Sequence, residues 1–258
     1  MKIIVVALIT ITLSNFAQAT SLFILGGQSN ASGQGSDAAY YPHDQAADQQ
    51  IQFYWVDPQL SDSGKWVTMQ PQAGIYPLGH FGPEVSLARG ALKLLNNDDV
   101  AIFKFTSGNT SLYKDWQIGK VMGLFAVFTK RLDAARKELQ QQHRGQAIAN
   151  RCFIWLQGES DAQNDLYSRA YENSLKQLVS IIREKLGTNI RIVLGVDEQH
   201  PWVRGNVEVV HIQKTLVAHD HNLRFVSMIG LPKADVTHLT AQGVREHGER
   251  LLEACLNK

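Results

Sequence analysis

Residues 22–35 read LFILGGQSNASGQG, an apolar run followed at once by glycines and small polar residues. Runs rich in β-branched or aromatic residues recur along the chain, at 100–105, 152–156, 190–196 and 223–228. Near-continuous apolar runs of this length are typical of strands buried on both faces of a parallel sheet. The sequence therefore predicts five strands, of which residues 22–25 form the first.

Segments with helical periodicity lie between and after these runs, at 83–95, 123–142, 165–186, 206–219 and 241–256. Repeated alternation of strand and helix predicts a three-layer α/β/α sandwich around a mostly parallel, five-stranded sheet. We expect one domain over residues 20–258. Residues 36–82 are rich in Pro, Gly, Asp and Gln and show little period, so we interpret them as a loop or hairpin insertion.

The N-terminus has the form of a targeting segment. Lys2 precedes an apolar run at residues 3–13, and the small-x-small sequence Ala17-Gln18-Ala19 follows it. This order is typical of a cleavable signal peptide over residues 1–19, cut near Ala19/Thr20. We therefore expect a secreted or periplasmic protein with no membrane anchor after cleavage; a buried N-terminal strand is the alternative interpretation.

The net charge and the two cysteines bear on which partner the protein binds and on whether it contains a disulfide. The 258 residues carry 25 Lys and Arg against 24 Asp and Glu, a net charge of +1, and this balance argues against a nucleic-acid partner. In an exported protein Cys152 and Cys255 can form a disulfide, but both also fit a core as small buried side chains, so the pairing stays open.

Polar segments follow four of the strands, and ligands of an open parallel sheet bind beyond the carboxyl ends of its strands. Ser29 follows the first strand on a glycine-containing turn, where a serine can be exposed as a nucleophile. The sequence Asp235-Val236-Thr237-His238 follows the last strand, and its spacing lets the Asp235 carboxylate orient the His238 imidazole. The alternative for Ser29 is a turn serine that caps a helix.

Acyl transfer also requires donors for a tetrahedral oxyanion. We expect these from the backbone N–H of Ser29, the backbone N–H of Gly108 and the side-chain amide of Gln157. Glu159 and Asp161 suggest the paired carboxylates of a glycosidase, but two residues on one turn meet the required separation only by accident.

Five blocks together resemble the SGNH/GDSL hydrolase superfamily, in its carbohydrate acetylesterase branch of sialate O-acetylesterases and acetylxylan esterases. The blocks, in order along the chain, are GGQSN (26–30), FGPE (81–84), SGNTSLYKDW (107–116), WLQGESDA (155–162) and DVTHLT (235–240). The resemblance implies the SGNH hydrolase fold, Ser29 as nucleophile, His238 as general base and Asp235 as its orienting carboxylate. It also implies Gly108 and Gln157 as oxyanion donors. The chain departs from the pattern at Asn109, where the group usually has a glycine.

The resulting hypothesis is an exported serine esterase that removes O-acetyl groups from a saccharide through an acyl-enzyme, without metal or other cofactor. The expected substrate is acetylated sialic acid or an acetylated xylan-type saccharide. We expect five residues to contact it, namely Gln28, Asn30, Asn109, Trp116 and Glu159. The alternatives are a short-chain lipase or thioesterase of the same superfamily and a noncatalytic carbohydrate-binding protein.

Overall fold

The computed structural model describes residues 19–95, 99–143 and 146–257. The expected signal peptide, residues 1–19, lies outside this part of the chain except for its last residue. No helix within the described residues is long and apolar enough to cross a bilayer.

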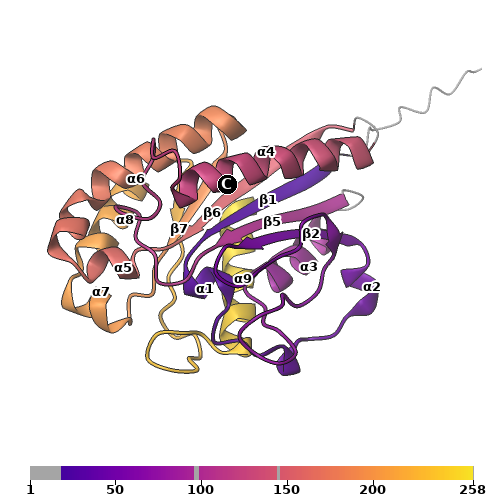
Figure 1. The fold of residues 1–258 in the computed structure, drawn as a ribbon, viewed down its shortest axis with the longest axis horizontal. Helices are drawn as coiled ribbons and strands as arrows, with labels where there is room; N and C mark the ends of the chain where they lie inside the picture. The colour runs from indigo at the N-terminus through magenta and orange to yellow at the C-terminus, as the bar shows by residue number, and fades with distance from the viewer. Residues whose placement is uncertain (1–18, 96–98, 144–145, 258) are drawn as a thin grey trace, which may run out of the picture.

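A single sheet forms the centre of the protein (Figure 1). Its strands lie in the order β3-β2-β5-β1-β6-β7-β8, and β4 pairs with β2. The parallel strands are β1 (Thr20–Gly27), β2 (Ile51–Asp57), β5 (Asp99–Thr106), β6 (Ile148–Leu156), β7 (Arg191–Gly195) and β8 (Leu223–Phe225). The antiparallel strands are the short β3 (Ser61–Asp62) and β4 (Val67–Thr68). The predicted α/β class with a mostly parallel sheet is confirmed.

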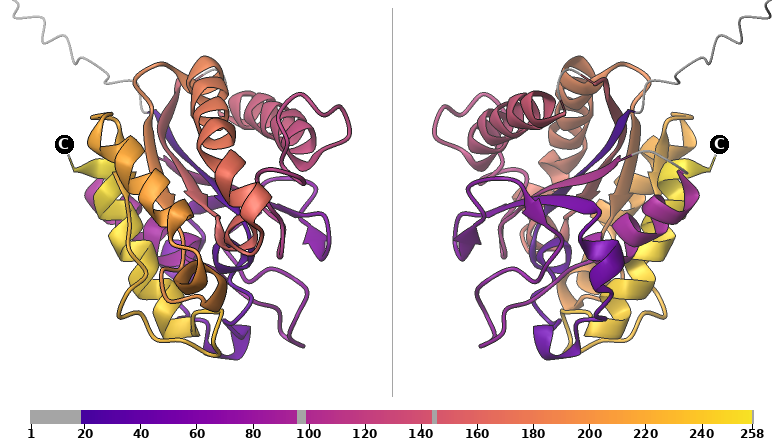
Figure 2. Two further views of the ribbon diagram at one scale, coloured as in Figure 1. Left: turned by 90° about the vertical axis from the view of Figure 1, so that its left-hand side faces the viewer. Right: turned by 90° about the vertical axis from the view of Figure 1, so that its right-hand side faces the viewer.

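Helices cover both faces of the sheet, and Figure 2 shows α3 and α9 on one side with α4 and α6 on the other. The long helices are α3 (Glu84–Leu94), α4 (Leu124–Gln142), α6 (Asp165–Leu186), α8 (Glu208–Ala218) and α9 (Ala241–Leu256). The short ones are α1 (Ser29–Ser32), η1 (Ala38–Tyr40), α2 (Gln45–Asp48), α5 (Glu159–Ala162) and α7 (Pro201–Gly205). All five helices expected from periodicity are present within two residues of their predicted bounds.

Two apolar cores fill the space between the sheet and these helices. Alternate residues of β1 point to opposite faces, so Leu22 and Ile24 pack toward α4 and α6, whereas Phe23 and Leu25 pack toward α3 and α9. All four side chains are buried, which explains the continuous apolar run in the sequence. A disulfide joins Cys152 of β6 to Cys255 of α9 across the second core, with 5.6 Å between the two Cα atoms.

The expected insertion at 36–82 contains a sixth parallel strand, which corrects the prediction of five. Strand β2 pairs in parallel with β5 and buries both of its faces. The connection from β1 to β2 contains only α1, η1 and α2, each of three or four residues. Because no long helix connects β1 to β2, the alternation of strand and helix that indicated the other strands is absent from this segment.

The chain runs from β1 to one side of the sheet through β2 and β5, and then to the other side through β6, β7 and β8. Strand β1 therefore lies at the topological switch point, where loops diverge and leave room for a ligand. Four of the five sequence blocks lie at the carboxyl ends of strands β1, β5 and β6 and in the segment after β8. The fifth, FGPE, leads into α3.

Candidate active site

Ser29 lies directly beyond β1, as the first residue of α1, and is 8% exposed. The turn before it depends on Gly27, whose φ is +145°. A Cβ at this position would lie 2.1 Å from the carbonyl oxygen of Leu156 in β6, so no other residue fits. Within the described residues the backbone N–H groups of Ser29 and Gly108 donate no hydrogen bond. Both donors therefore remain available to an oxyanion.

His238 lies in a hairpin-like loop, residues 232–240, which we call the histidine loop. Backbone hydrogen bonds close it from Ala234 N to His238 O (2.9 Å) and from Thr240 N to Pro232 O (3.0 Å). Asp235 organises its tip, because its Oδ1 accepts from the backbone N–H of Thr237 (2.6 Å) and of His238 (2.8 Å). Its Oδ2 lies 2.9 Å from Nδ1 of the His238 ring. The predicted Asp–His contact is thus present in the structure.

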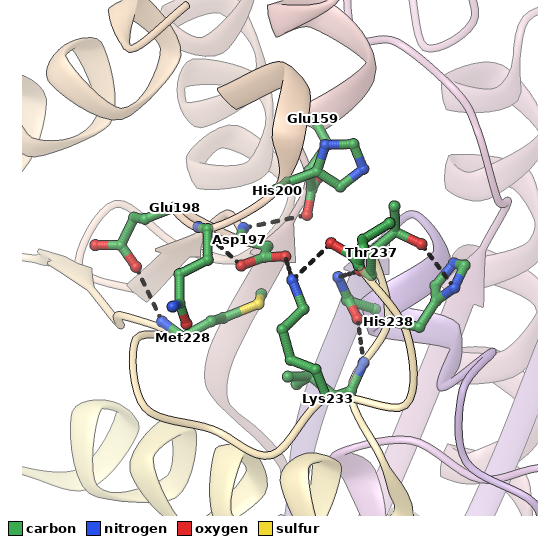
Figure 3. A network of polar contacts seen from close by, with 12 residues as sticks. Glu159, Asp197, Glu198, His200, Met228, Lys233, Thr237 and His238 are labelled. Atoms are coloured by element: carbon green, nitrogen blue, oxygen red, sulfur yellow. Dashed lines mark hydrogen bonds and ion pairs between the residues drawn. The ribbon is translucent and has the colours of Figure 1, made fainter. Parts of the chain in front are cut away.

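The Asp235 carboxylate stays ionised in this position. Burial opposes ionisation, but hydrogen bonds from His238 and Thr237 outweigh it and hold the pKa of Asp235 well below its usual range. Thr237 Oγ1 also lies 2.9 Å from His238 Nδ1 (Figure 3). A proton kept on Nδ1 leaves Nε2 as the basic nitrogen, which is the arrangement a general base requires.

Asn30 connects the nucleophile turn to the histidine loop. Its Nδ2 donates to the carbonyl of Thr237 (3.0 Å), and its Oδ1 accepts from the backbone N–H of Leu239 (3.1 Å). The residue beside Ser29 therefore binds the backbone on both sides of His238. No hydrogen bond joins Ser29 Oγ to the imidazole within the described residues. The expectation that Asn30 contacts substrate is corrected, because the side chain is 2% exposed and both ends of its amide are occupied.

A second connection holds the histidine loop from the other side (Figure 3). Lys233 Nζ donates to Asp197 Oδ2 (2.5 Å) and to the carbonyl of Val236 (2.9 Å). The backbone N–H of Asp197 donates to Glu159 Oε1 (3.1 Å). Sequence reasoning missed Lys233 and Asp197, although Asp197 directly follows the predicted strand at 190–196 and so had the same positional signal as Ser29.

Glu159 is 1% exposed, so the expectation that it contacts substrate is also corrected. Burial raises its pKa to about 7, against hydrogen bonds from the backbone N–H groups of Glu159 and Asp197 that lower it. Its Oε2 has no hydrogen-bond partner in the described structure. Glu159 therefore holds the backbone at Asp197, just after the end of β7.

Gly108 lies in the segment after β5, which several side chains hold in place. Thr110 Oγ1 donates to Ser107 O (2.7 Å) and accepts from the indole N–H of Trp116 (2.8 Å). Gln59 Nε2 donates to Ser107 Oγ (2.9 Å) and Gly108 O (3.1 Å). Trp116 has no exposed surface and packs edge-on against Trp155, so the expectation that it contacts substrate is corrected.

Gln157 and Asp161 hold the same segment from β6 and α5. Asp161 Oδ2 accepts from Leu112 N (2.7 Å), and Oδ1 accepts from Tyr113 N (3.0 Å). Gln157 Nε2 donates to Thr110 O (3.1 Å) and Asp161 Oδ2 (2.5 Å). Both amide hydrogens of Gln157 are therefore used, which corrects the expectation of an oxyanion donor. Burial raises the pKa of Asp161 to about 6, and these hydrogen bonds act in the opposite direction.

Asn109 and Gln28, the remaining residues expected to contact substrate, differ in their exposure. Asn109 is exposed with a φ of +54°, a conformation that glycine adopts freely and that asparagine tolerates better than most residues. This explains how asparagine replaces the usual glycine and leaves its side chain available to substrate. Gln28 is 4% exposed and accepts from Gly158 N (3.5 Å), so it links two loops and its expected substrate contact is corrected.

The structure thus brings the serine turn, the Asp–His loop and the Gly108 segment to one edge of a parallel sheet. This arrangement defines the class of SGNH-type carbohydrate esterases. The family model described as "Carbohydrate esterase, sialic acid-specific acetylesterase" matches residues 19–257, so the chain belongs to that family. It is a carboxylic ester hydrolase of the carbohydrate O-acetylesterase type.

Solved structures share the fold at low sequence identity. A protein from Arabidopsis thaliana is 22% identical with a TM-score of 0.69, over 93% of this chain and 99% of the other. NanS is 15% identical with a TM-score of 0.68, over 93% and 97%. The acetylxylan esterase Axe2 from Geobacillus stearothermophilus is 13% identical with a TM-score of 0.51, over 94% and 96%. No curated protein matches the chain significantly.

Proposed function

We propose that the protein is an exported serine esterase that removes O-acetyl groups from a carbohydrate through an acetyl-enzyme. Ser29 Oγ attacks the acetyl carbonyl carbon while His238 Nε2 takes the hydroxyl proton. The N–H groups of Ser29 and Gly108 donate to the oxyanion that forms. Collapse breaks the C–O bond to the sugar, whose oxygen receives the proton from His238.

Water then completes the cycle. His238 Nε2 removes a proton from a water molecule, the resulting hydroxide attacks the acetyl carbonyl, and Ser29 leaves with that proton while acetate is released. Asp235 stabilises the imidazolium in both halves of the reaction. The Asp235–His238 contact on a loop bound by Asn30, the neighbour of Ser29, is the observation that carries the proposal.

O-acetylated sialic acid is the substrate that we favour, because the chain belongs to a family of sialic acid-specific acetylesterases. Acetylated xylan-type saccharides are the alternative, since one of the similar solved structures is an acetylxylan esterase. Export is supported by the N-terminal sequence pattern and by the Cys152–Cys255 disulfide, a bond that persists in oxidising compartments.

Replacing Ser29 by alanine tests the mechanism. We expect Ser29→Ala to lower kcat for a nitrophenyl acetate by about 10⁴-fold or more, with an unchanged circular dichroism spectrum. Mass spectrometry of acid-quenched wild type should find one acetyl group on the peptide that contains Ser29. Ser160→Ala is the matched control, since Ser160 lies in the neighbouring α5 turn and its hydroxyl makes no hydrogen bond in the described structure. Retained turnover in Ser29→Ala, or an acetyl group on another residue, overturns the proposal.

A further inference from the structure

A cavity of about 680 Å³ lies beside the histidine loop, between the segment that follows Ser29 and the start of α9. We call it the tyrosine cavity, because Tyr40, Tyr41 and Tyr76 line it together with Arg245. We propose that it binds the saccharide part of the ester and that Arg245 pairs with a carboxylate on that sugar. This inference rests on the proposed function and adds the site that selects a sugar acid.

The cavity adjoins the histidine loop, because Ala234 of that loop and Gly35, which lies close to His238, both line it. A Cβ at Gly35 would lie 2.7 Å from His238 Cβ and 3.2 Å from Ala234 Cβ, so the glycine allows the histidine loop to close against this segment. A ligand in the cavity therefore lies next to the backbone that carries the proposed general base.

Gln34 connects the cavity to the oxyanion side of the site. Its carbonyl accepts from the Tyr76 hydroxyl (3.2 Å), which fixes one wall of the cavity. Its side-chain amide lies against Gly108, since a Cβ there would come within 2.4 Å of Gln34 Nε2. Gln34 thus contacts both Gly108, a proposed oxyanion donor, and Tyr76, which lines the tyrosine cavity.

The lining suits a saccharide. The Tyr40 side chain is 73% exposed, and an open aromatic ring can cover the C–H face of a sugar while its hydroxyl reaches a sugar oxygen. Asp37 also lines the cavity, with Oδ1 accepting from Ala39 N (2.8 Å), and its other oxygen can accept from sugar hydroxyl groups. The volume lies within the range of small-molecule sites, about 300–1,000 Å³.

Arg245 supplies the charge. Its Nε donates to Ala241 O (3.3 Å), and it forms no ion pair with any acidic residue in the described part of the chain. The guanidinium end is therefore available for a bidentate pair with a carboxylate. A cavity lined by one arginine and one aspartate can pair its positive charge with the carboxylate of a sugar acid, an interaction that a neutral sugar cannot make.

The experiment compares three esters: O-acetylated sialic acid, its neutral carboxyl methyl ester, and a nitrophenyl acetate with no sugar. For Arg245→Gln we expect KM for the acid to rise about ten- to hundredfold, with KM for the methyl ester and kcat/KM for nitrophenyl acetate unchanged. For Tyr40→Ala we expect KM to rise several-fold for both sugar esters only. Arg204→Gln is the control, because it removes the same charge from an exposed side chain of α7.

An unchanged KM for the acid in Arg245→Gln overturns the proposal, as does an equal loss on all three esters or a larger effect from Arg204→Gln. If wild type releases acetate from none of the esters, the proposed function fails, and calorimetry with free sialic acid then tests the cavity alone. Binding that Arg245→Gln weakens at least tenfold supports the cavity assignment. Absent binding, or equal binding by wild type and variant, overturns it.

Discussion

The nucleophile turn and the histidine loop hold the two halves of the proposed catalytic pair by different means. The turn at 27–33 follows a central strand, and every residue of α1 is buried. The histidine loop lies at the surface, where the Asp235 side chain is 52% exposed, and its backbone is held by acceptors on Asp235 and Asn30 and by the Lys233 ammonium group, which donates to it. Packing therefore places the serine, whereas a few polar contacts place the base.

This contrast predicts that changes in the loop affect rate and changes in the turn affect stability. Among changes in the histidine loop and the turn at 27–33, Asp235→Asn should give the largest loss of rate, a fall in kcat of about 10³–10⁴-fold, because an amide no longer stabilises the imidazolium or selects the Nδ1 proton. Its free energy of unfolding should fall by about 1–2 kcal/mol, less than the loss of transition-state stabilisation, because the side chain is half exposed and the amide oxygen still accepts from the backbone N–H groups of Thr237 and His238. Steady-state kinetics and urea denaturation measure the two quantities.

Asp133→Asn provides the control, since Asp133 is an exposed carboxylate of α4 paired with Lys185, away from the site. It should leave kcat unchanged. A stability loss in Asp235→Asn as large as the loss of transition-state stabilisation would remove the distinction between the two regions.

The turn should respond in the opposite way. Gly27→Ala places a Cβ 2.1 Å from Leu156 O at a φ of +145°, so β1 and β6 must separate or the turn must change. We expect a loss of about 3 kcal/mol or more in the free energy of unfolding, seen as a lower urea midpoint.

Gly187→Ala separates backbone strain from the clash. Gly187 also has a positive φ, +116°, but a Cβ there meets no atom within 4 Å. It should cost about 1–2 kcal/mol. Equal losses in the two variants would mean that close packing of β1 on β6 does not set the position of Ser29.

A further expected effect concerns the pH dependence of stability that Glu159, which accepts from Asp197 N, confers on the protein. Because burial raises the pKa of Glu159 from 4.5 to about 7, the folded state binds more protons than the unfolded state between these values. This contribution to stability is complete below pH 4.5 and is lost as pH rises to 7, a change of roughly 3 kcal/mol at most.

Glu159→Gln removes the titration and keeps an acceptor for Asp197 N. The decline in unfolding free energy between pH 5 and pH 8 should therefore be smaller in the variant than in wild type, when both are measured by urea denaturation. Identical pH dependence in the two proteins would show that Glu159 is ionised throughout this range.

The positions of several site residues could be predicted from the sequence, because these residues directly follow predicted strands. Ser29, Gly108 and Asp235-x-x-His238 lie at one sheet edge, as position alone indicated. The expected substrate residues were less accurate, since Gln28, Asn30, Trp116 and Glu159 are buried and bind other loops. A polar side chain near a catalytic residue looks the same in sequence whether it faces a ligand or supports a loop.

Local sequence patterns were enough to specify the layered α/β fold, because strands buried on both faces require continuous apolar runs and amphipathic helices require a 3.6-residue period. Three-dimensional packing was needed to show that β2 belongs to the sheet, that Cys152 meets Cys255, and that Lys233, Asp197 and Asn30 hold the histidine loop. These contacts join residues far apart along the chain, so their distances depend on how the loops pack, and no local pattern records them.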